Sequence, residues 1–127
     1  MVSLTGTSLC PFPCTHMACL FCKIVSRDVA ATIVAEDAHC LAFRDIHPAA
    51  PTHVLVIPKE HVASLNQMTD PALGGRLLAF ARDVAVAEGI AESGYRVVLN
   101  TNADGGQTVF HLHAHLLGGR AAGWPPG

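Results

Sequence analysis

Runs of alternating or β-branched apolar residues predict five short strands in this chain. Their ranges are 32–35, 40–43, 52–57, 95–100 and 109–117. Between the third and fourth strands the apolar period becomes that of a helix: Asp70 is a suitable N-cap, Pro71 suits the first helical position, and the apolar stripe ends near Gly89. The sequence therefore predicts one long helix among short strands.

The links between these elements are mostly short. A short helical turn is predicted over 18–28, and residues 36–39 form a turn that makes the first two strands a hairpin. Residues 101–107 are rich in glycine, asparagine and aspartate, which predicts a turn able to present backbone N–H groups to an anion. Because tight links join antiparallel neighbours, we expect an α+β fold in which the long helix covers an antiparallel sheet.

The last predicted strand carries three histidines, His111, His113 and His115, at every second position. Successive side chains of a strand point to opposite faces, so the three imidazoles share one face and the apolar residues between them share the other. A strand rises about 3.3 Å per residue, which separates the outer two histidines by roughly 13 Å. Two interpretations remain: a metal site that uses two of the histidines, or a row in which each has its own role.

Composition narrows the function. The chain has 127 residues, of which 50% are hydrophobic and 14% charged, with a formal net charge of −2, as is typical of one compact domain. The near-neutral charge and the lack of a basic cluster argue against nucleic acid as a partner. No apolar run approaches the roughly 20 residues that span a bilayer and no signal peptide is recognisable, so we expect a cytoplasmic protein without a membrane partner.

The cysteines and the N-terminus affect where chemistry is expected. Five cysteines are an odd number for a disulfide framework, and Cys19 and Cys22 have the spacing of a metal or redox pair, so structural disulfides are not expected. Residues 1–16 lack any hydrophobic period. We interpret them as a leader or tag, with Met17 as the natural start, and assign the domain to residues 17–127.

The segment from His111 to Leu117 resembles the alternating histidine signature of the histidine triad family. Further stretches resemble the Hint branch of that family, the purine nucleoside phosphoramidases; these are residues 41–48, 51–59, 104–107 and 117–127. The resemblance implies a homodimer in which each chain forms a five-stranded antiparallel sheet with one long helix and a short N-terminal helix. It also implies hydrolysis of the P–N bond of purine nucleoside 5′-phosphoramidates through a covalent nucleotidyl-histidine, with release of the nucleoside monophosphate.

The resemblance assigns the reaction to four residues. His113 is the expected nucleophile, since a neutral imidazole is nucleophilic near pH 7. His115 is expected to hydrogen-bond the phosphate oxygens. His53 and the backbone around His111 are expected to fix the tautomer of His113, and Thr108, where serine is usual, is expected to contact the leaving group.

The nucleotide is expected to contact a larger set of residues. Asp45 matches the carboxylate that accepts the ribose hydroxyls, and Trp124 matches a residue that reaches across the dimer. The complete set comprises Val29, Phe43, Asp45, Ile46, Asn100, Gln107, Thr108, His113, His115 and Trp124. Without the resemblance, the three apolar members Val29, Phe43 and Ile46 would be interpreted as ordinary core, and Trp124 could equally belong to a mobile tail.

In bacterial members that resemble this chain, the cysteine pair binds zinc together with two histidines; the matching residues are Cys19, Cys22, His61 and His111. Thiolate and imidazole are favoured zinc ligands, and a site closed by four protein ligands is structural rather than catalytic. We therefore expect a structural zinc and no cofactor for the reaction itself. The alternative is a pair of small buried thiols.

Two other functions fit the same residues. A zinc hydrolase or a cupin-like oxygenase would use His111 and His113 as a metal-binding pair. A nucleotide-binding adaptor or sensor would keep the site and turn over little. The three functions differ in what His113 touches: a phosphorus atom that it attacks, a metal ion, or a nucleotide that it only binds.

Overall fold

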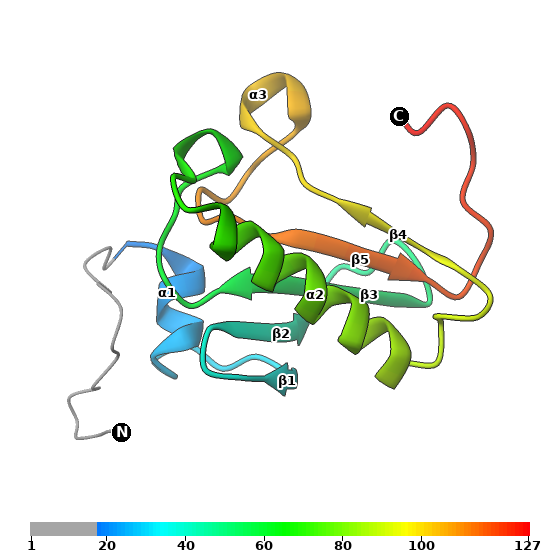
Figure 1. Ribbon diagram of the computed structural model, residues 1–127, viewed down its shortest axis with the longest axis horizontal. Coiled ribbons are helices and arrows are strands. Elements are labelled where there is room, and N and C mark those ends of the chain that lie inside the picture. The colour runs from blue at the N-terminus through cyan, green and yellow to red at the C-terminus, as the bar shows by residue number, and fades with distance from the viewer. Residues whose placement is uncertain (1–17) are drawn as a thin grey trace.

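The computed structural model describes residues 18–127; the predicted leader, 1–16, and the predicted start at Met17 lie outside the described residues. The elements are α1 (Leu20–Val25), β1 (Ile33–Glu36), β2 (Cys40–Arg44), β3 (Thr52–Pro58), the 3-10 turn η1 (Leu65–Gln67), α2 (Pro71–Ala87), β4 (Tyr95–Val98), α3 (Asn102–Gly105) and β5 (Ala114–Gly118), as Figure 1 shows. The predicted succession of strands and helices is confirmed, with η1 and α3 as additions.

The five strands form one antiparallel sheet in the order β1-β2-β3-β5-β4. β5 lies between β3 and β4, and pairs Ala114 with Val56 on one side and Leu116 with Val97 on the other. The last strand of the sequence is therefore an inner strand of the sheet. The predicted α+β fold with a five-stranded antiparallel sheet is confirmed.

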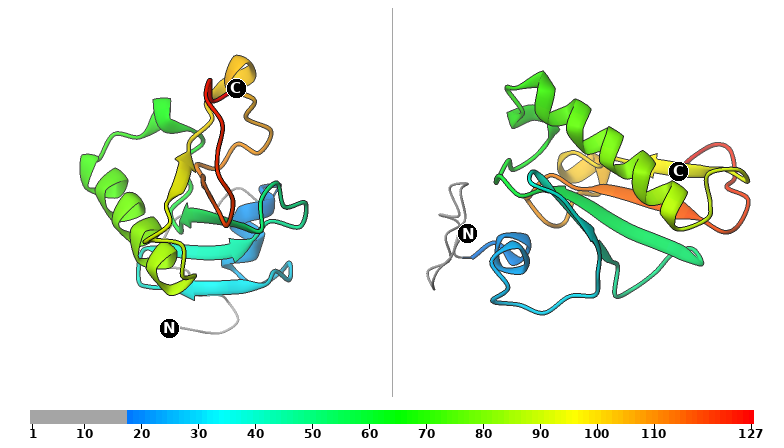
Figure 2. Two further views of the ribbon diagram at one scale, coloured as in Figure 1. Left: turned by 90° about the vertical axis from the view of Figure 1, so that its right-hand side faces the viewer. Right: turned by 60° about the horizontal axis from the view of Figure 1, so that its bottom comes forward.

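Different helices cover the two faces of the sheet (Figure 2). α2 packs on the face to which Val54, Val56 and Leu116 point, and forms the larger apolar cluster with them. α1 lies on the opposite face, where Phe21 and Ile24 join a second cluster with residues of β2 and β3. Because side chains alternate along each strand, neighbouring residues of one strand enter different clusters. The histidines lie on the face that α1 covers.

The ends of α2 agree with the signals in its sequence. Asp70 caps the helix by accepting a hydrogen bond from the Ala72 N–H on its Oδ1 at 3.0 Å, and Pro71 begins the first turn. Gly89 follows the helix with a φ of 77°, a left-handed conformation that suits glycine. The buried stripe consists of Leu73, Leu77, Ala81, Val84 and Ala85. Neither α2 nor any other described helix is long and apolar enough to cross a membrane.

The histidine segment differs from its prediction. β5 begins at Ala114, so residues 109–113 precede the strand and do not form its first half. The neighbouring strand β3 ends at Pro58, which has no N–H for a further ladder bond, and the Pro58 carbonyl oxygen accepts a hydrogen bond from His111 Nε2 at 2.8 Å. The alternation of faces persists beyond the strand, because Leu112 still enters the cluster under α2.

The predicted turn over 101–107 contains a single helical turn, α3. Gly106 ends it with a φ of 82°, and the side-chain Oε1 of Gln107 accepts a hydrogen bond from the Asn102 N–H at 2.9 Å. This contact satisfies an N–H at the start of α3, where the Thr101 side chain makes no capping bond. The Gln107 side chain, which follows α3 in the sequence, therefore stabilises a helical turn that the local composition does not favour.

Two adjacent leucines of α2 test this packing. Leu77 is 2% exposed and Leu78 is 52% exposed. Replacing either leucine by alanine changes the helix propensity by the same amount, so the two variants differ in the packing that they remove. Leu77→Ala should lower the free energy of unfolding by about 2–5 kcal/mol, because it leaves a cavity between α2 and the sheet. Leu78→Ala should cost less than about 1 kcal/mol. Urea unfolding measures both values, and equal losses would contradict the arrangement.

Candidate active site

A row of aromatic rings crosses the face of the sheet that α1 covers. Phe43 of β2 and Phe21 of α1 meet edge to face with ring centroids 5.3 Å apart, and Phe21 meets His113 in the same way at 5.2 Å. The centroids of His113 and His115 are 5.0 Å apart, and those of His115 and His53 of β3 are 5.2 Å apart. Residues distant in the sequence are thus brought into one continuous set of contacts.

The backbone holds the ring of His113 in one tautomer. Its Nδ1 lies 2.7 Å from the carbonyl oxygen of His111, which can only accept, so Nδ1 carries the proton and Nε2 carries the lone pair. The side chain is 7% exposed. Burial lowers the pKa of His113 below its ordinary value, an effect that the His111 hydrogen bond and Asp45 partly offset. The neutral, nucleophilic form is therefore favoured near pH 7.

The ring of His115 has the opposite tautomer. The Ala49 N–H donates to His53 Nδ1 at 2.9 Å, so a neutral His53 carries its proton on Nε2. His53 Nε2 lies 2.9 Å from His115 Nδ1, which therefore accepts, and His115 carries its own proton on Nε2. The resemblance assigns His53 to the network around His113, whereas in the structure it is hydrogen-bonded to His115, because β3 and β5 are neighbours in the sheet.

Asp45 lies beside this histidine pair. Its Oδ2 is 3.4 Å from His53 Nε2, and its Oδ1 accepts a hydrogen bond from the His47 N–H at 2.8 Å. Burial lowers the pKa of His115 to about 4, with the nearby His113 and His53 adding to the shift and Asp45 opposing it. Near pH 7 His115 is therefore a neutral ring that offers an N–H donor.

Asp45, His53 and His115 also place three potential metal-ligand atoms within 4.8 Å of one another. A metal ion would need the lone pair on His53 Nε2. However, His53 Nδ1 already accepts the Ala49 N–H, and a neutral imidazole has only one nitrogen with a lone pair. We therefore interpret this group as a hydrogen-bonded relay and not as a metal site.

A second cluster joins α1 to the segments around His61 and His111. Its four members, Cys19, Cys22, His61 and His111, place one ligand atom each within 4.8 Å of one another. The Cys22 Sγ lies 3.3 Å from His61 Nδ1 and 3.6 Å from His111 Nδ1, and the Cys19 Sγ lies 3.5 Å from His111 Nδ1. Tetrahedral zinc, with bonds of about 2.3 Å to sulfur and about 2.0 Å to nitrogen, separates these atoms by about 3.6 Å. The four side chains therefore fit a metal ion.

The chemistry of the donors supports the same conclusion. His111 Nε2 donates to the Pro58 carbonyl oxygen, so the lone pair of that ring is on Nδ1, the nitrogen that faces the sulfurs. Cys19 and Cys22 are free thiols, and burial together with the neighbouring Cys19 raises the pKa of Cys22 to about 12, so a thiolate at Cys22 requires a bound cation. Among the described residues His113 belongs to neither ligand group, which argues against a metal pair of His111 and His113.

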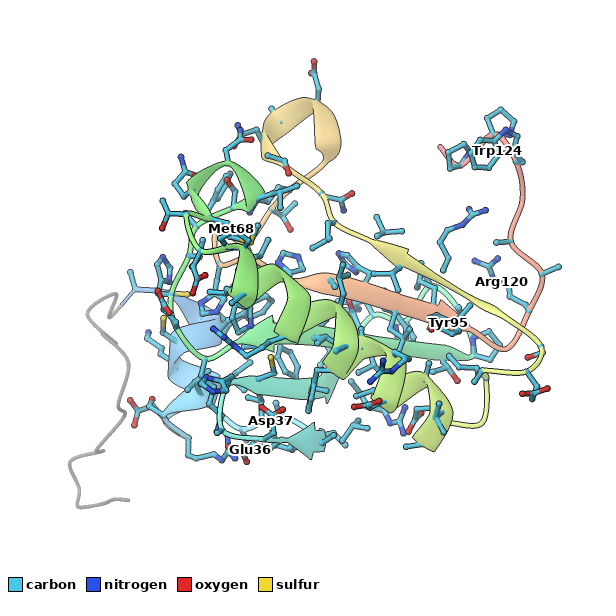
Figure 3. All side chains as sticks on the ribbon, in the orientation of Figure 1. Glu36, Asp37, Met68, Tyr95, Arg120 and Trp124 are labelled. Atoms are coloured by element: carbon cyan, nitrogen blue, oxygen red, sulfur yellow. The ribbon has the colours of Figure 1, made fainter. Side chains whose placement is uncertain are left out.

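The predicted walls of the base pocket lie in different surroundings. Phe43 is buried, and Val29 packs partly buried against the same cluster, so both also serve as core. Ile46 is 85% exposed, next to Asp45 in the sequence, so ordinary core packing does not explain it. Trp124 is 83% exposed, and Figure 3 shows it on the C-terminal segment beyond β5.

Gln107 is buried, and its side chain is engaged with the main chain. Its Nε2 donates to the carbonyl oxygens of Ala63 and Val109 at 2.9 and 3.1 Å, while its Oε1 accepts the Asn102 N–H. The resemblance assigns Gln107 to the phosphate. In the structure these three bonds give it a clear role in holding the segment before β5 against the loop that contains Ala63.

Thr108 directly follows Gln107 in the sequence. It is exposed and lines a hollow of about 670 Å³, together with Leu20, His61 and Phe110, whereas His113 does not line this hollow. Asn100 is half-buried in the loop after β4. The hollow therefore adjoins the cluster of Cys19, Cys22, His61 and His111, called the metal-binding cluster below because its side chains fit a metal ion.

Sequence reasoning missed several groups that hold the site in place. Two are main-chain groups, the Pro58 carbonyl oxygen and the Ala49 N–H. Such groups recur along the whole main chain, so the sequence does not indicate which of them will contact a histidine. The third is Phe21, whose ring contacts both His111 and His113, at 6.0 and 5.2 Å between centroids. Its position between the two cysteines was the one available signal.

The family model of the HIT domain matches residues 26–122 of this chain. The chain belongs to the HIT family. The match includes Asp45, His53 and the three histidines of the alternating segment, so the resemblance on which they were selected is confirmed. Cys19, Cys22 and Trp124 lie outside the matched range, and what is said of them rests on geometry and exposure.

Individual HIT proteins are similar over most of the chain. A purine nucleoside phosphoramidase of Escherichia coli (strain K12) is 48% identical over 107 residues, which cover 82% of this chain and 89% of that protein. The crystal structure of a HIT family hydrolase from Legionella pneumophila is 54% identical with a TM-score of 0.83, and the match covers 86% and 99% of the two chains. A histidine triad nucleotide-binding protein from Candida albicans is 31% identical with a TM-score of 0.74, over 84% and 82%.

The lowered pKa of His115 predicts how this HIT domain responds to acid. The folded-state pKa lies below the unfolded value of about 6.5, so the unfolded chain binds more protons between that value and pH 4. The free energy of unfolding should therefore fall as the pH is lowered through this window. His115→Gln should reduce the slope, and His47→Gln, at an exposed position, should leave it unchanged. Urea unfolding at several pH values measures the slopes, and three equal slopes would disprove the assignment.

Proposed function

We propose that this protein hydrolyses the P–N bond of purine nucleoside 5′-phosphoramidates through a nucleotidyl-His113 intermediate and releases the nucleoside monophosphate. The observation that carries the proposal is the pair of opposite tautomers. His113 has a lone pair on Nε2, and the adjacent His115 has a proton on Nε2. One ring can attack an electrophile while the other donates a hydrogen bond to an oxygen that gains negative charge. The activity named for the Escherichia coli relative supports the same substrate class.

The reaction has two steps. In the first, the lone pair of His113 Nε2 forms a bond to phosphorus, and the P–N bond of the substrate breaks with its electron pair on the departing amine. The amine takes a proton from solvent, which the exposed Thr108 hydroxyl would relay, while the His115 Nε2–H hydrogen-bonds a phosphoryl oxygen. In the second, water attacks the same phosphorus and gives up a proton to solvent, and the bond to His113 breaks with its electron pair on Nε2. The monophosphate then leaves with the neutral ring restored.

We assign the nucleoside to the region around the end of β2. A carboxylate with two acceptor oxygens suits a pair of ribose hydroxyls, and that of Asp45 is 19% exposed. The exposed Ile46, with Phe43 and Val29, would bound the base. Asn100 would complete the phosphate end of the site. The purine preference rests on the name of the Escherichia coli relative.

We propose zinc as the ion of the cluster formed by Cys19, Cys22, His61 and His111. Two thiolates and two imidazoles are a donor set that zinc favours, and four protein ligands leave no position for water. The ion would supply a cross-link between α1 and the two histidine segments. No group bound to it takes part in the reaction described above.

We also propose a homodimer in which Trp124 reaches the substrate of the partner. Its indole is 83% exposed in the single chain, and the dimer would give it a contact. A nucleotide-binding adaptor with little turnover is the second candidate function, supported by the name of the Candida albicans relative. The two functions make different predictions for the unaltered protein, which the following experiment separates.

His113→Asn should lower kcat for hydrolysis of an adenosine 5′-phosphoramidate on the order of 10³-fold, because the amide is no nucleophile. Binding of AMP, measured by calorimetry, should change by less than about threefold. The unaltered protein, quenched in mild base, should yield a peptide with a nucleotidyl group on His113 by mass spectrometry. His47→Asn, the same change at an exposed histidine, should retain full activity.

Two results would count against the proposed chemistry. Undiminished hydrolysis by His113→Asn would exclude His113 as the nucleophile. Binding of AMP without any turnover by the unaltered protein would instead indicate the adaptor.

Protein purified without chelator should contain about one zinc ion per chain, as measured by elemental analysis. Cys22→Ser should reduce this content strongly, because it removes a thiolate from the cluster. Cys40 is another buried free thiol, and among the described residues it belongs to neither group of potential metal ligands. Cys40→Ser should therefore leave the zinc content unchanged. Absence of metal from the unaltered protein would refute the assignment.

A further inference from the structure

One peptide group connects the metal-binding cluster to His113. The His111 carbonyl oxygen accepts the His113 Nδ1–H at 2.7 Å, and the N–H at the other end of the same peptide, that of Leu112, donates to the Val62 carbonyl oxygen at 2.6 Å. Val62 directly follows His61. The peptide that fixes the tautomer of His113 is therefore held between the segments of both histidine members of the cluster.

A second contact connects the cysteine half of the cluster to His113. Phe21 lies between Cys19 and Cys22 in the first turn of α1, and its side chain is 4% exposed. Its ring meets that of His113 edge to face, with centroids 5.2 Å apart and planes at 90°, and also contacts the ring of His111. In a closely packed interior such a contact restricts the plane that the imidazole can adopt.

Both cysteines of the cluster lie at the start of α1. The helix has 6 residues, fewer than the about 12 that a helix needs to be stable alone. The Cys19 Sγ accepts the Cys22 N–H at 3.4 Å, so one sulfur of the cluster caps the helix that carries the other. α1 also makes apolar contacts with the sheet through the buried Phe21 and Ile24 and the partly buried Val25.

We propose that the metal-binding cluster positions the nucleophile. It holds the peptide between His111 and Leu112, which fixes the tautomer of His113, and it holds α1, which places the ring of Phe21 against the imidazole. Phe21 and His111 are then positioning residues and not catalytic residues. The inference rests on the proposed function, because it concerns His113 as the group that attacks phosphorus. The cluster thereby affects the rate of a reaction in which no metal-bound group takes part.

The first test observes the ring of His113 directly. Protein labelled with ¹⁵N at histidine and loaded with zinc should give the ring-nitrogen pattern of the Nδ1–H tautomer for His113. After zinc is removed from protein that stays folded by circular dichroism, this pattern should shift toward a mixture of both tautomers. The signals of His53 and His115, which are bonded to each other, should keep their pattern. An unchanged His113 pattern without zinc overturns the proposal.

A pair of variants tests whether α1 positions His113. The test uses zinc-loaded protein, so it also applies if the chain unfolds when zinc is removed. Phe21→Leu and Ile24→Ala both remove packing from the buried face of α1, but Phe21 contacts His113, whereas Ile24 packs on the next turn. Phe21→Leu should lower kcat about tenfold through misplacement of the nucleophile. Phe21→Leu should leave KM and zinc content within about twofold of the values for the unaltered protein. Ile24→Ala should leave kcat, KM and zinc content all within that range. Equal losses of kcat, or a rise of KM alone in Phe21→Leu, overturn the proposal.

These tests separate the positioning role from the proposed function. If the unaltered protein hydrolyses no phosphoramidate, the proposed function fails, and the ring-nitrogen pattern still decides whether the cluster positions His113. If it hydrolyses phosphoramidates and neither the tautomer nor kcat responds, the positioning role fails alone.

Discussion

The peptide between His111 and Leu112 is hydrogen-bonded at both of its polar atoms, and the candidate active site depends on it. Its N–H donates to Val62 and is therefore not available to a β-ladder, which agrees with the start of β5 at Ala114. Its carbonyl oxygen accepts from His113 and so places the lone pair of that ring on Nε2. A shorter strand and a defined tautomer of His113 result from the same small set of hydrogen bonds.

The sheet separates packing from chemistry. The face under α2 carries the larger apolar cluster, and the face under α1 carries a smaller cluster together with the histidines. Because side chains alternate, the same strands serve both faces, and the inner position of β5 brings His115 next to His53, far away in the sequence. Burial is the largest cause of the lowered pKa of both His113 and His115, so the fold keeps these rings neutral by excluding water from them.

Much of the fold could be predicted because its signals are local. The cap, the proline and the apolar stripe of α2 act within a few residues, and the spacing of Cys19 and Cys22 already indicated a metal or redox pair. The predictions failed where the outcome depends on a distant partner. The extent of the histidine strand depends on Pro58 of β3, and the partner of His53 depends on which strands are neighbours. Neither follows from a periodic pattern, because the pattern does not contain the register of the sheet.

By itself, the sequence determined that His111, His113 and His115 share one face, because an extended backbone has a period of two whatever surrounds it. Only the tertiary structure decided what each imidazole can do. The His111 carbonyl oxygen leaves His113 with a lone pair to offer, while Ala49, acting through His53, leaves His115 with a proton to donate. The hydrogen bond at one ring nitrogen sets the state of the other, so chemically identical side chains acquire opposite roles from the groups that the fold places behind them.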